Sequence, residues 1–335
     1  CRIIKIHKMA NDFRDGYKPD FLGKNIPFPK VEGELKNQLA TLKNSSETEL
    51  KYTHFSSVMH KSRMLPVFTA VNIRGSEFDP LTRGEDAWAY DDRMDETFQL
   101  GEELYSNDLG TFDRGHMVRR MDPAWGKKPL PEQADGDTFH FTNCTPQHAN
   151  LNRKIWQELE RHVLENGASG GKVDISVFTG PVLRKDDKIF VNLIKGREIQ
   201  IPVIFWKIIV WKKRSDNKLY AVGFMQSQWP WVKSRLREPR VGPLAAKRVA
   251  YTDNYFEHLE FKGGKTYQVS IPTIEKLTGL KFDWEGVSFP YKEKDFNEIK
   301  GTKTKTVTPE TMKVTISRGT HGAAGHYKLR NVILG

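Results

Sequence analysis

The sequence predicts an α+β fold whose central sheet is mainly antiparallel. Short stretches rich in β-branched and aromatic residues recur along the chain between turn signals, which is the pattern of strands. The predicted strands are 64–73, 137–143, 173–179, 189–194, 199–210, 219–225 and 267–271. Helical periodicity is confined to a few segments inserted among these strands, and that combination favours the α+β class.

The clearest helix is predicted over residues 150–166. Apolar side chains recur there at every fourth position, and Gly167 follows as a C-cap. The recurring residues are Leu151, Ile155, Leu159 and Val163. A shorter helix over 272–278 is expected to end near Gly279.

With 335 residues the chain is long enough for one large domain or two ordinary ones. Residues 1–50 are turn-rich and are expected to form an arm that wraps over a core domain at 51–290. Residues 291–335 are rich in Lys, Thr and Gly and are expected to be a C-terminal extension. Residues 74–110 are polar and irregular, and loops of this length are usually functional.

The composition points to an anionic partner. The formal net charge of +11 suits a nucleic acid, an acidic membrane surface or an acidic protein, although it also serves simple solubility. Two cysteines exclude a disulfide framework and a cysteine-based zinc site. The longest apolar run, 201–211, is interrupted by Lys207 and reaches about half of the ~20 residues that a membrane helix needs. We therefore expect no membrane partner.

The chain begins with Cys1 rather than Met, so it is expected to be a mature fragment or part of a longer polypeptide. No segment resembles a signal peptide, and the absence of a disulfide framework does not fix the compartment. Secreted and cytoplasmic locations both stay open.

One short run combines residue types that suit phosphate chemistry. In Asp113-Arg-Gly-His116, the histidine suits a general base and Arg114 offers a planar fork for a phosphate. The glycine between them allows a sharp turn or a close approach to a ligand. A structural turn is the alternative interpretation of this run.

Two further features follow the run. Asn143-Cys-Thr-Pro-Gln147 ends a predicted strand, and Asn152 and Glu160 share the next predicted helix. Eight residues place these two side chains about 80° apart around the helix and about 12 Å apart along it. One could bind a cation while the other binds its water shell, which suits magnesium. The alternative is an amphipathic helix with a solvated polar face.

Together these segments resemble the DNA/RNA non-specific endonucleases, a family that includes the endonuclease-G-like enzymes. The resemblance covers about residues 50–285. It is carried by Asp113-Arg-Gly-His116, Asn143-x-x-Pro-Gln147, Leu151-Asn-x-x-x-Trp156 with Leu159-Glu160, Phe178-Thr-Gly-Pro181, Pro202-x-x-x-Trp206-Lys and the segment Tyr267–Gly279. It implies the ββα-metal (His-Me finger) fold.

The resemblance also implies an activity and a role for each motif residue. The family hydrolyses phosphodiester bonds of DNA and RNA with little regard to sequence, uses Mg²⁺ and leaves 5′-phosphates, and Mn²⁺ is a candidate substitute. His116 would take a proton from the attacking water, and Asn152 would bind the metal directly. Glu160 would hold a metal-bound water, Asn143 would help to fix the geometry, and Arg114 would lie near the phosphate or support the loop.

An arginine upstream of the motif stabilises developing negative charge in the family. Arg93 is the best candidate, because it lies in the acidic stretch 91–96, and Arg74 is the rival. Residues 227–262 form a basic insertion relative to the family. Aromatic residues accompany its cations, so it could form a wall for nucleic acid, or it could be a surface excursion. These residues are Trp229, Trp231, Lys233, Arg235, Arg237, Arg240, Lys247 and Arg248. Arg74, Lys233, Arg235 and Arg237 are the candidates for contacts with nucleic acid.

Two other functions stay open at this point. One is a catalytically silent or regulated nucleic-acid-binding module, and the other is a phosphodiesterase for small nucleotides on the same fold. His140 and His148 are expected to be core or surface residues rather than ligands, and Cys144 is expected to be a buried small residue. The resemblance suggests a homodimer, and an inhibitor or an upstream regulatory domain is a further candidate partner.

Overall fold

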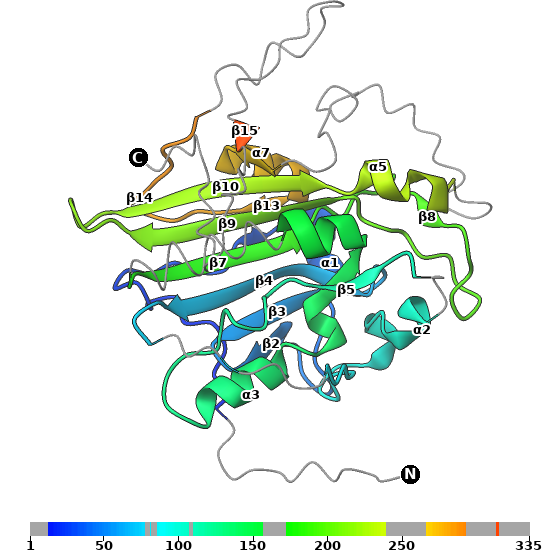
Figure 1. The fold of residues 1–335 in the computed structure, drawn as a ribbon, viewed down its shortest axis with the longest axis horizontal. Helices are drawn as coiled ribbons and strands as arrows, with labels where there is room; N and C mark the ends of the chain where they lie inside the picture. Colours follow the sequence, from blue (N-terminus) through cyan, green and yellow to red (C-terminus); the bar gives the residue numbers. More distant parts are fainter. Residues whose placement is uncertain are drawn as a thin grey trace, which may run out of the picture.

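The computed structural model describes residues 13–77, 81, 86–106, 110–156, 172–238, 266–292 and 313–314. The described strands form a nine-stranded sheet in the order β15-β12-β10-β9-β7-β4-β3-β2, with β14 beside β10 (Figure 1). Only the β10–β14 pair is parallel among these neighbours. The strands are β2 (Glu49–Tyr52), β3 (Phe55–His60), β4 (Leu65–Arg74), β7 (Asp174–Pro181), β9 (Ile204–Lys212), β10 (Leu219–Ser227), β12 (Thr266–Val269), β14 (Val287–Ser288) and β15 (Lys313–Val314).

The sheet confirms the predicted α+β class with mainly antiparallel pairing. Its central strands are apolar and β-branched because both of their faces are covered. In β4, every residue from Leu65 to Ile73 is buried, and only Arg74 at its end is partly exposed. Such strands show no apolar–polar alternation, and their composition is the signal that identifies them.

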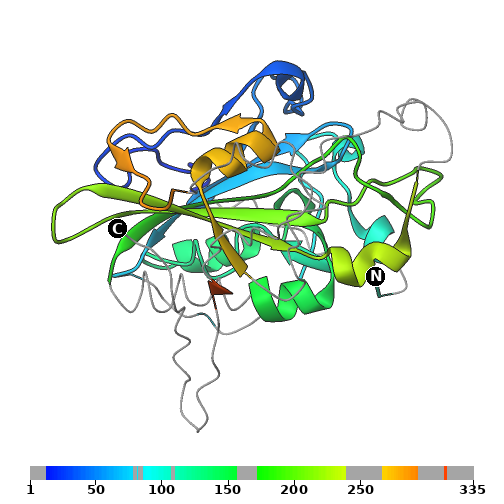
Figure 2. The same ribbon diagram turned by 90° about the horizontal axis from the view of Figure 1, so that it is seen from above.

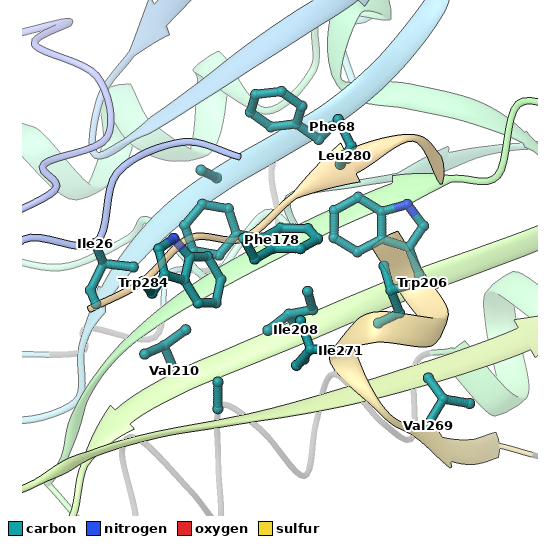
Figure 3. Packing of buried hydrophobic residues seen from close by; sticks show 14 of the residues in the cluster. Ile26, Phe68, Phe178, Trp206, Ile208, Val210, Val269, Ile271, Leu280 and Trp284 are labelled. Carbon is teal, nitrogen blue, oxygen red and sulfur yellow. The ribbon is translucent and has the colours of Figure 1, made fainter. Parts of the chain in front are cut away.

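One face of the sheet is covered by the N-terminal segment together with α7 (Ile271–Thr278) and β13 (Leu280–Lys281). The blue and orange ribbons lie together on this side in Figure 2. Ile26, Phe178 and Trp284 belong to the apolar cluster between them (Figure 3). The short strand β1 (Lys30–Val31) pairs with β13 and fastens the N-terminal segment. The described part of the predicted arm therefore packs into the main core, while its boundary at residue 50 stays a prediction.

The other face carries the segments that follow the long loop. They are α3 (Leu130–Asp137), η2 (Phe141–Asn143) and the two-stranded hairpin of β5 (Asp113–His116) with β6 (Cys144–Gln147). Val118, Met121 and Ala124, which follow β5, pack on this face against residues of the sheet. The hairpin thus rests on a rigid base.

Shorter elements complete the described chain. They are α1 (Gly33–Asn37), η1 (Glu96–Phe98), α2 (Glu102–Tyr105), η3 (Leu151–Trp156), β8 (Ile189–Phe190), α5 (Trp229–Val232), η5 (Lys233–Arg235) and β11 (Leu236–Arg237). β8 pairs with β11, which places α5 and η5 beside this pair at one end of the molecule (Figure 1). Within the described ranges, no helix has the length and apolar character needed to span a membrane.

One predicted strand is wrong. Residues 137–143 alternate in polarity, yet the chain there leaves α3 at Asp137 and forms the turn η2. The backbone amides of Thr138 and Phe139 bond back to Asp135 and Gly136, which ends the helix in a tight turn instead of an extended strand. The helix predicted over 150–166 is seen as the π-helical segment η3, and residues 157–166 lie outside the described part.

Candidate active site

Two antiparallel strands and a helical segment bring the motif residues together. In the β5–β6 hairpin, Asp113 lies opposite Gln147 and His116 lies opposite Cys144. The chain then passes through His148 into η3, which carries Asn152. This order of two strands and a helix matches the ββα arrangement that the resemblance implies.

A close side-chain approach explains the glycine of the motif. The buried Gln147 side chain lies over Gly115, and a Cβ atom built on Gly115 would stand 2.2 Å from Gln147 Oε1. Real Cβ atoms do not approach other atoms so closely, so any larger residue at 115 would displace Gln147 or open the hairpin.

Aromatic rings hold the His116 side chain. The Trp88 ring centroid lies 4.7 Å from that of His116, and Phe139 meets the imidazole edge to face at 5.2 Å. The imidazole is partly buried between these rings. Because its backbone is also fixed by pairing with Cys144, the ring has little rotational freedom.

Asn143 fastens the chain that leaves His116. Its Oδ1 accepts from the Val118 amide at 2.9 Å, and its Nδ2 donates to the carbonyls of Val118 and Thr138 at 2.9 and 3.0 Å. Its backbone carbonyl also accepts from the Met117 amide. The side chain is fully buried, and its bonds hold the backbone at Val118, two residues after His116, to that at Thr138.

Asp113 connects the motif to the helix that carries Asn152. The Asn152 Nδ2 donates to Asp113 Oδ2 at 3.1 Å, while Arg153 makes a two-pronged ion pair with the same carboxylate at 2.8 and 2.6 Å. The amide nitrogen is thereby directed to Asp113, which reserves the Asn152 carbonyl oxygen for other partners. The sequence motif alone does not assign a role to Asp113 or Arg153. Their ion pair joins residues that are 40 positions apart in the chain, so only the fold reveals it.

The Asn152 side-chain oxygen and the Asp113 carboxylate fit a hydrated cation. No group of three or more His, Cys, Asp or Glu side chains that could enclose a metal occurs among the residues described. Magnesium, however, commonly keeps several waters and uses one or two protein oxygens. The side-chain carbonyl oxygen of Asn152 is of this type, and the Asp113 carboxylate bonded to the same amide carries a negative charge that suits a cation. Glu160, the predicted partner of the water shell, lies outside the described residues.

Arg114 points to the opposite side of the hairpin from Asp113, since neighbouring strand residues alternate. Its guanidinium forms an ion pair with Glu102 and lies over the Tyr105 ring, 5.2 Å from the centroid. These contacts join β5 to α2. The two predicted roles of Arg114, near the phosphate or as a support of the loop, stay predictions.

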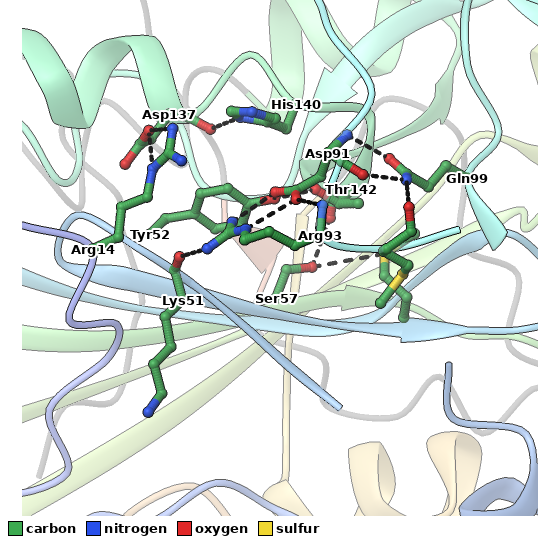
Figure 4. A network of polar contacts seen from close by, with 12 residues as sticks. Arg14, Lys51, Tyr52, Ser57, Asp91, Arg93, Gln99, Asp137, His140 and Thr142 are labelled. Carbon is green, nitrogen blue, oxygen red and sulfur yellow. Dashed lines mark hydrogen bonds and ion pairs between the residues drawn. The ribbon is translucent and has the colours of Figure 1, made fainter. Parts of the chain in front are cut away.

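Arg93 is held in a buried polar network (Figure 4). It forms an ion pair with Asp91 at 2.6 Å, donates to the Lys51 carbonyl at 2.6 Å and lies over the Tyr52 ring. Burial alone would raise the pKa of Asp91, but the hydrogen bonds and charge of Arg93 hold it well below its ordinary value. None of these described contacts reaches His116 or Asn152.

The rival Arg74 is engaged differently. Its guanidinium lies over the neighbouring rings of Phe21 and Trp125, at 5.1 and 4.9 Å from their centroids. It also lies near the carboxylates of Glu77 and Asp174. Its described contacts likewise include neither His116 nor Asn152. The described contacts therefore place both upstream arginines in clusters other than the hairpin of His116 and the segment of Asn152.

The described part of the basic insertion lies beyond β10. Lys233 is exposed, and Arg235 lies 6.0 Å from the Phe190 ring centroid. Arg237 is bound by Glu198 at 2.9 Å, which suits a structural ion pair. Residues 239–262 lie outside the described part.

Cys144 is buried beside the site but is not suited to catalysis. Burial raises the pKa of its thiol to about 12, so it stays protonated at neutral pH. This agrees with its expected role as a small packing residue.

Comparison with known proteins identifies the family of the chain. The model of the DNA/RNA non-specific endonuclease family matches residues 36–288. An uncharacterized protein of Sinorhizobium fredii, y4fB, is 36% identical over 282 residues, which are 81% of this chain and 39% of that protein. Human mitochondrial endonuclease G is 25% identical over 158 residues, 40% of this chain and 50% of its own length. Zebrafish (Danio rerio) mitochondrial nuclease EXOG is 30% identical over 118 residues, 33% of this chain and 32% of its own length.

The chain thus spans about a third to a half of the length of these relatives. A solved structure titled as an EndoG/EndoGI complex aligns at a TM-score of 0.47 with 17% identity, covering 71% of this chain and 86% of that one. Since the family model covers three quarters of the sequence, the chain belongs to the DNA/RNA non-specific endonuclease family.

Proposed function

We propose that this chain is a metal-dependent endonuclease that hydrolyses phosphodiester bonds in DNA, RNA or both with little regard to sequence. The observation that carries the proposal is the bond between Asn152 Nδ2 and Asp113. It links a candidate cation ligand to the strand that ends in His116. Mg²⁺ is the proposed cofactor, Mn²⁺ its candidate substitute, and a 5′-phosphate the proposed product end.

His116 is proposed as the general base. A neutral imidazole can accept a proton from water as the water attacks phosphorus, and such catalysis contributes typically 10²–10⁴-fold. The contacts with Trp88 and Phe139 support this role, because they restrict the ring to one orientation. Asn143 supports it indirectly by fixing the backbone that follows.

Asn152 is proposed to hold the cation through its carbonyl oxygen, with Glu160 holding a water of its shell. When bound there, the cation would act as a Lewis acid toward a phosphate oxygen. Asp113 orients the Asn152 amide, and Arg153 offsets part of the Asp113 charge. Arg153 is 70% exposed, so it also offers a cation next to the path of the substrate.

The proposed substrate is a polymer. The groups named above act on phosphate, and phosphate contacts position a nucleic acid without reading its bases. The net charge of +11 supports a polyanionic partner, and cleavage should weaken steeply with salt. A cavity of about 190 Å³ lies between residues 96–103 and 194–199, and its lining includes neither His116 nor Asn152. That cavity gives no support to a small-nucleotide phosphodiesterase.

The test is degradation of supercoiled plasmid and of structured RNA, each with Mg²⁺ or with EDTA. We expect Mg²⁺-dependent cleavage that is lost in His116→Ala. His60→Ala is the matched control, because His60 is a partly buried histidine on β3. Circular dichroism of each variant checks folding. Cleavage in EDTA, or undiminished cleavage by His116→Ala, would overturn the proposal, and inactivity of a folded wild type would favour a binding module.

A further inference from the structure

We propose that the exposed indole of Trp229, on the short helix α5, is a stacking platform for an unpaired base beside the cleavage site. The enzyme would then prefer single-stranded or locally unpaired nucleic acid. This inference rests on the proposed function, since it specifies the form of the substrate. It is drawn from three observations: the attachment of the platform to the helix of Asn152, the exposure of Trp229 and the nearby cations.

The platform is attached to the segment that carries Asn152. The His148 carbonyl accepts from the amides of Leu151 and Asn152 at 2.9 and 3.0 Å and so begins η3. The His148 Nδ1 accepts from the Asn150 amide at 3.1 Å, which fixes its ring. The imidazole also lies close enough to Asp113 to feel its charge, although burial dominates and lowers the His148 pKa.

Gln228 holds α5 against this connection. Its Oε1 accepts from the His148 amide at 2.7 Å, and its Nε2 donates to the carbonyls of Pro146 and Pro202 at 3.0 and 2.7 Å. The side chain is fully buried, so these bonds are shielded from water. The Trp231 ring consequently lies nearly parallel to the His148 ring, with 14° between their planes and 5.8 Å between their centroids.

Trp231 is part of the support of the site itself. It packs against the cluster of Met117, Leu151 and Phe205. Met117 follows His116 directly, and Leu151 precedes Asn152. Trp231 therefore anchors α5, which carries Trp229, to the residues next to the proposed base and metal ligand.

Trp229 presents the surface that a base could cover. Its side chain is 41% exposed, and only Leu193 shares this property among the large hydrophobic residues described. Its indole has no stacking partner within the described chain, and Pro230 beside it limits the backbone. An indole has only two rotatable side-chain bonds, so it loses little conformational entropy when a base stacks on it.

The charges around Trp229 suit a nucleic-acid strand. Lys233 is exposed one turn beyond it, and Arg235 follows. Arg153 is exposed on η3, the segment that His148 begins. Single-strand-binding proteins combine such cations, which track phosphates, with aromatic rings, on which bases stack. In a duplex the base faces are already stacked on each other, so an indole can reach them only where bases are unpaired or flipped out.

The test uses the full chain with His116→Ala, so that binding is measured without cleavage. The probes are a fluorescein-labelled single-stranded oligonucleotide and the duplex of the same sequence, followed by anisotropy at fixed salt. We expect Trp229→Ala to weaken single-strand binding roughly tenfold and duplex binding much less. Trp229→Phe should restore part of the loss, because it keeps a ring. Leu193→Ala is the matched control and should change neither affinity.

Equal effects of Trp229→Ala on both probes, or no effect on either, would overturn the platform. A shift of oligomeric state in Trp229→Ala with unchanged single-strand affinity would also overturn it, since Trp229 would then be a contact between copies. These outcomes are separable from the proposed function. Cleavage by the wild type tests that function, whereas the binding ratio of the two probes tests the platform.

Discussion

The side-chain amide of Asn152 donates a hydrogen bond to the Asp113 carboxylate, with 3.1 Å between Nδ2 and Oδ2. The two residues lie on different elements, and the bond sets which atom of the amide can meet a cation. It therefore makes the first residue of the Asp-Arg-Gly-His run a positioning residue for the proposed metal ligand.

We expect Asp113→Asn to raise the Mg²⁺ concentration needed for half-maximal cleavage by about 10–100-fold, the usual effect of removing a group that orients a metal ligand. The variant loses the charge that binds Arg153 and can turn the Asn152 amide. A Mg²⁺ titration of plasmid cleavage measures this. Asp186→Asn, which breaks the exposed ion pair with Arg184, is the control. An unchanged Mg²⁺ requirement in Asp113→Asn would refute the positioning role.

The effects of substitutions at Gly115 and Gln147 on stability should depend on each other, because the Gln147 side chain lies where a Cβ on Gly115 would stand. Gly115→Ala places a Cβ 2.2 Å from Gln147 Oε1, so we expect a loss of about 1–3 kcal/mol in the free energy of unfolding and reduced cleavage. Gly115→Ala/Gln147→Ala should recover much of both losses. Gly136→Ala is the control, since nothing lies within 4 Å of a Cβ there. If the losses in the free energy of unfolding caused by Gly115→Ala and Gln147→Ala simply add in the double variant, the packing explanation is contradicted.

Asn143→Ala removes three side-chain hydrogen bonds to buried backbone. At about 1 kcal/mol each, the free energy of unfolding should fall by about 2–4 kcal/mol. Cleavage by the folded protein should fall too, because the chain beyond His116 is released. Urea unfolding and cleavage below the unfolding transition measure the two effects, with the exposed Asn37→Ala as control. Full stability of Asn143→Ala would disprove the fastening role.

Arg93 offers a test between two roles. Arg93→Met leaves the buried Asp91 carboxylate uncompensated, so we expect a loss of about 3 kcal/mol in stability. In the folded fraction, kcat should change by less than about tenfold, since loss of a charge-stabilising group typically costs 10²–10³-fold. A large loss of kcat with unchanged stability would instead support the catalytic role that the sequence suggested.

The same ion pair predicts a pH dependence of stability. The folded-state pKa of Asp91 lies below its unfolded value of about 4, so the pair contributes fully above that pH. Its contribution is lost as the pH falls from about 4 through the folded pKa. The free energy of unfolding in urea should therefore depend less on pH in Asp91→Asn than in the wild type. The range from about pH 5 to about pH 3 spans the ordinary pKa of an aspartate and suits the measurement. Parallel slopes would contradict this assignment.

Much of the sheet could be predicted from local sequence. β4, β7 and β10 are runs of β-branched and aromatic residues, and α7 carries its own signals in the Ser270 N-cap and in Gly279, whose φ is +72°. Such signals act between near neighbours and need no knowledge of the fold.

The missed features depend on distant contacts. The chain at 137–143 alternates like a strand, but the Thr138 and Phe139 amides bond back to α3, and the Asn143 side chain bonds across the fold to Val118. Likewise, an arginine in an acidic stretch looks available for substrate, and only the folded structure brings Tyr52 and Lys51 to Arg93. Motif residues were predictable because their chemistry is local, whereas the partners that position them are not.

The most direct measurement is a Mg²⁺ titration of plasmid nicking by the wild type, His116→Ala and Asn152→Ala. We predict saturable nicking by the wild type. His116→Ala should lower the maximal rate by about 10²–10⁴-fold with little change in the Mg²⁺ midpoint, whereas Asn152→Ala should move the midpoint to much higher Mg²⁺. Nicking by folded His116→Ala at the wild-type rate, or an unchanged midpoint in Asn152→Ala, would contradict the assignment of these two residues.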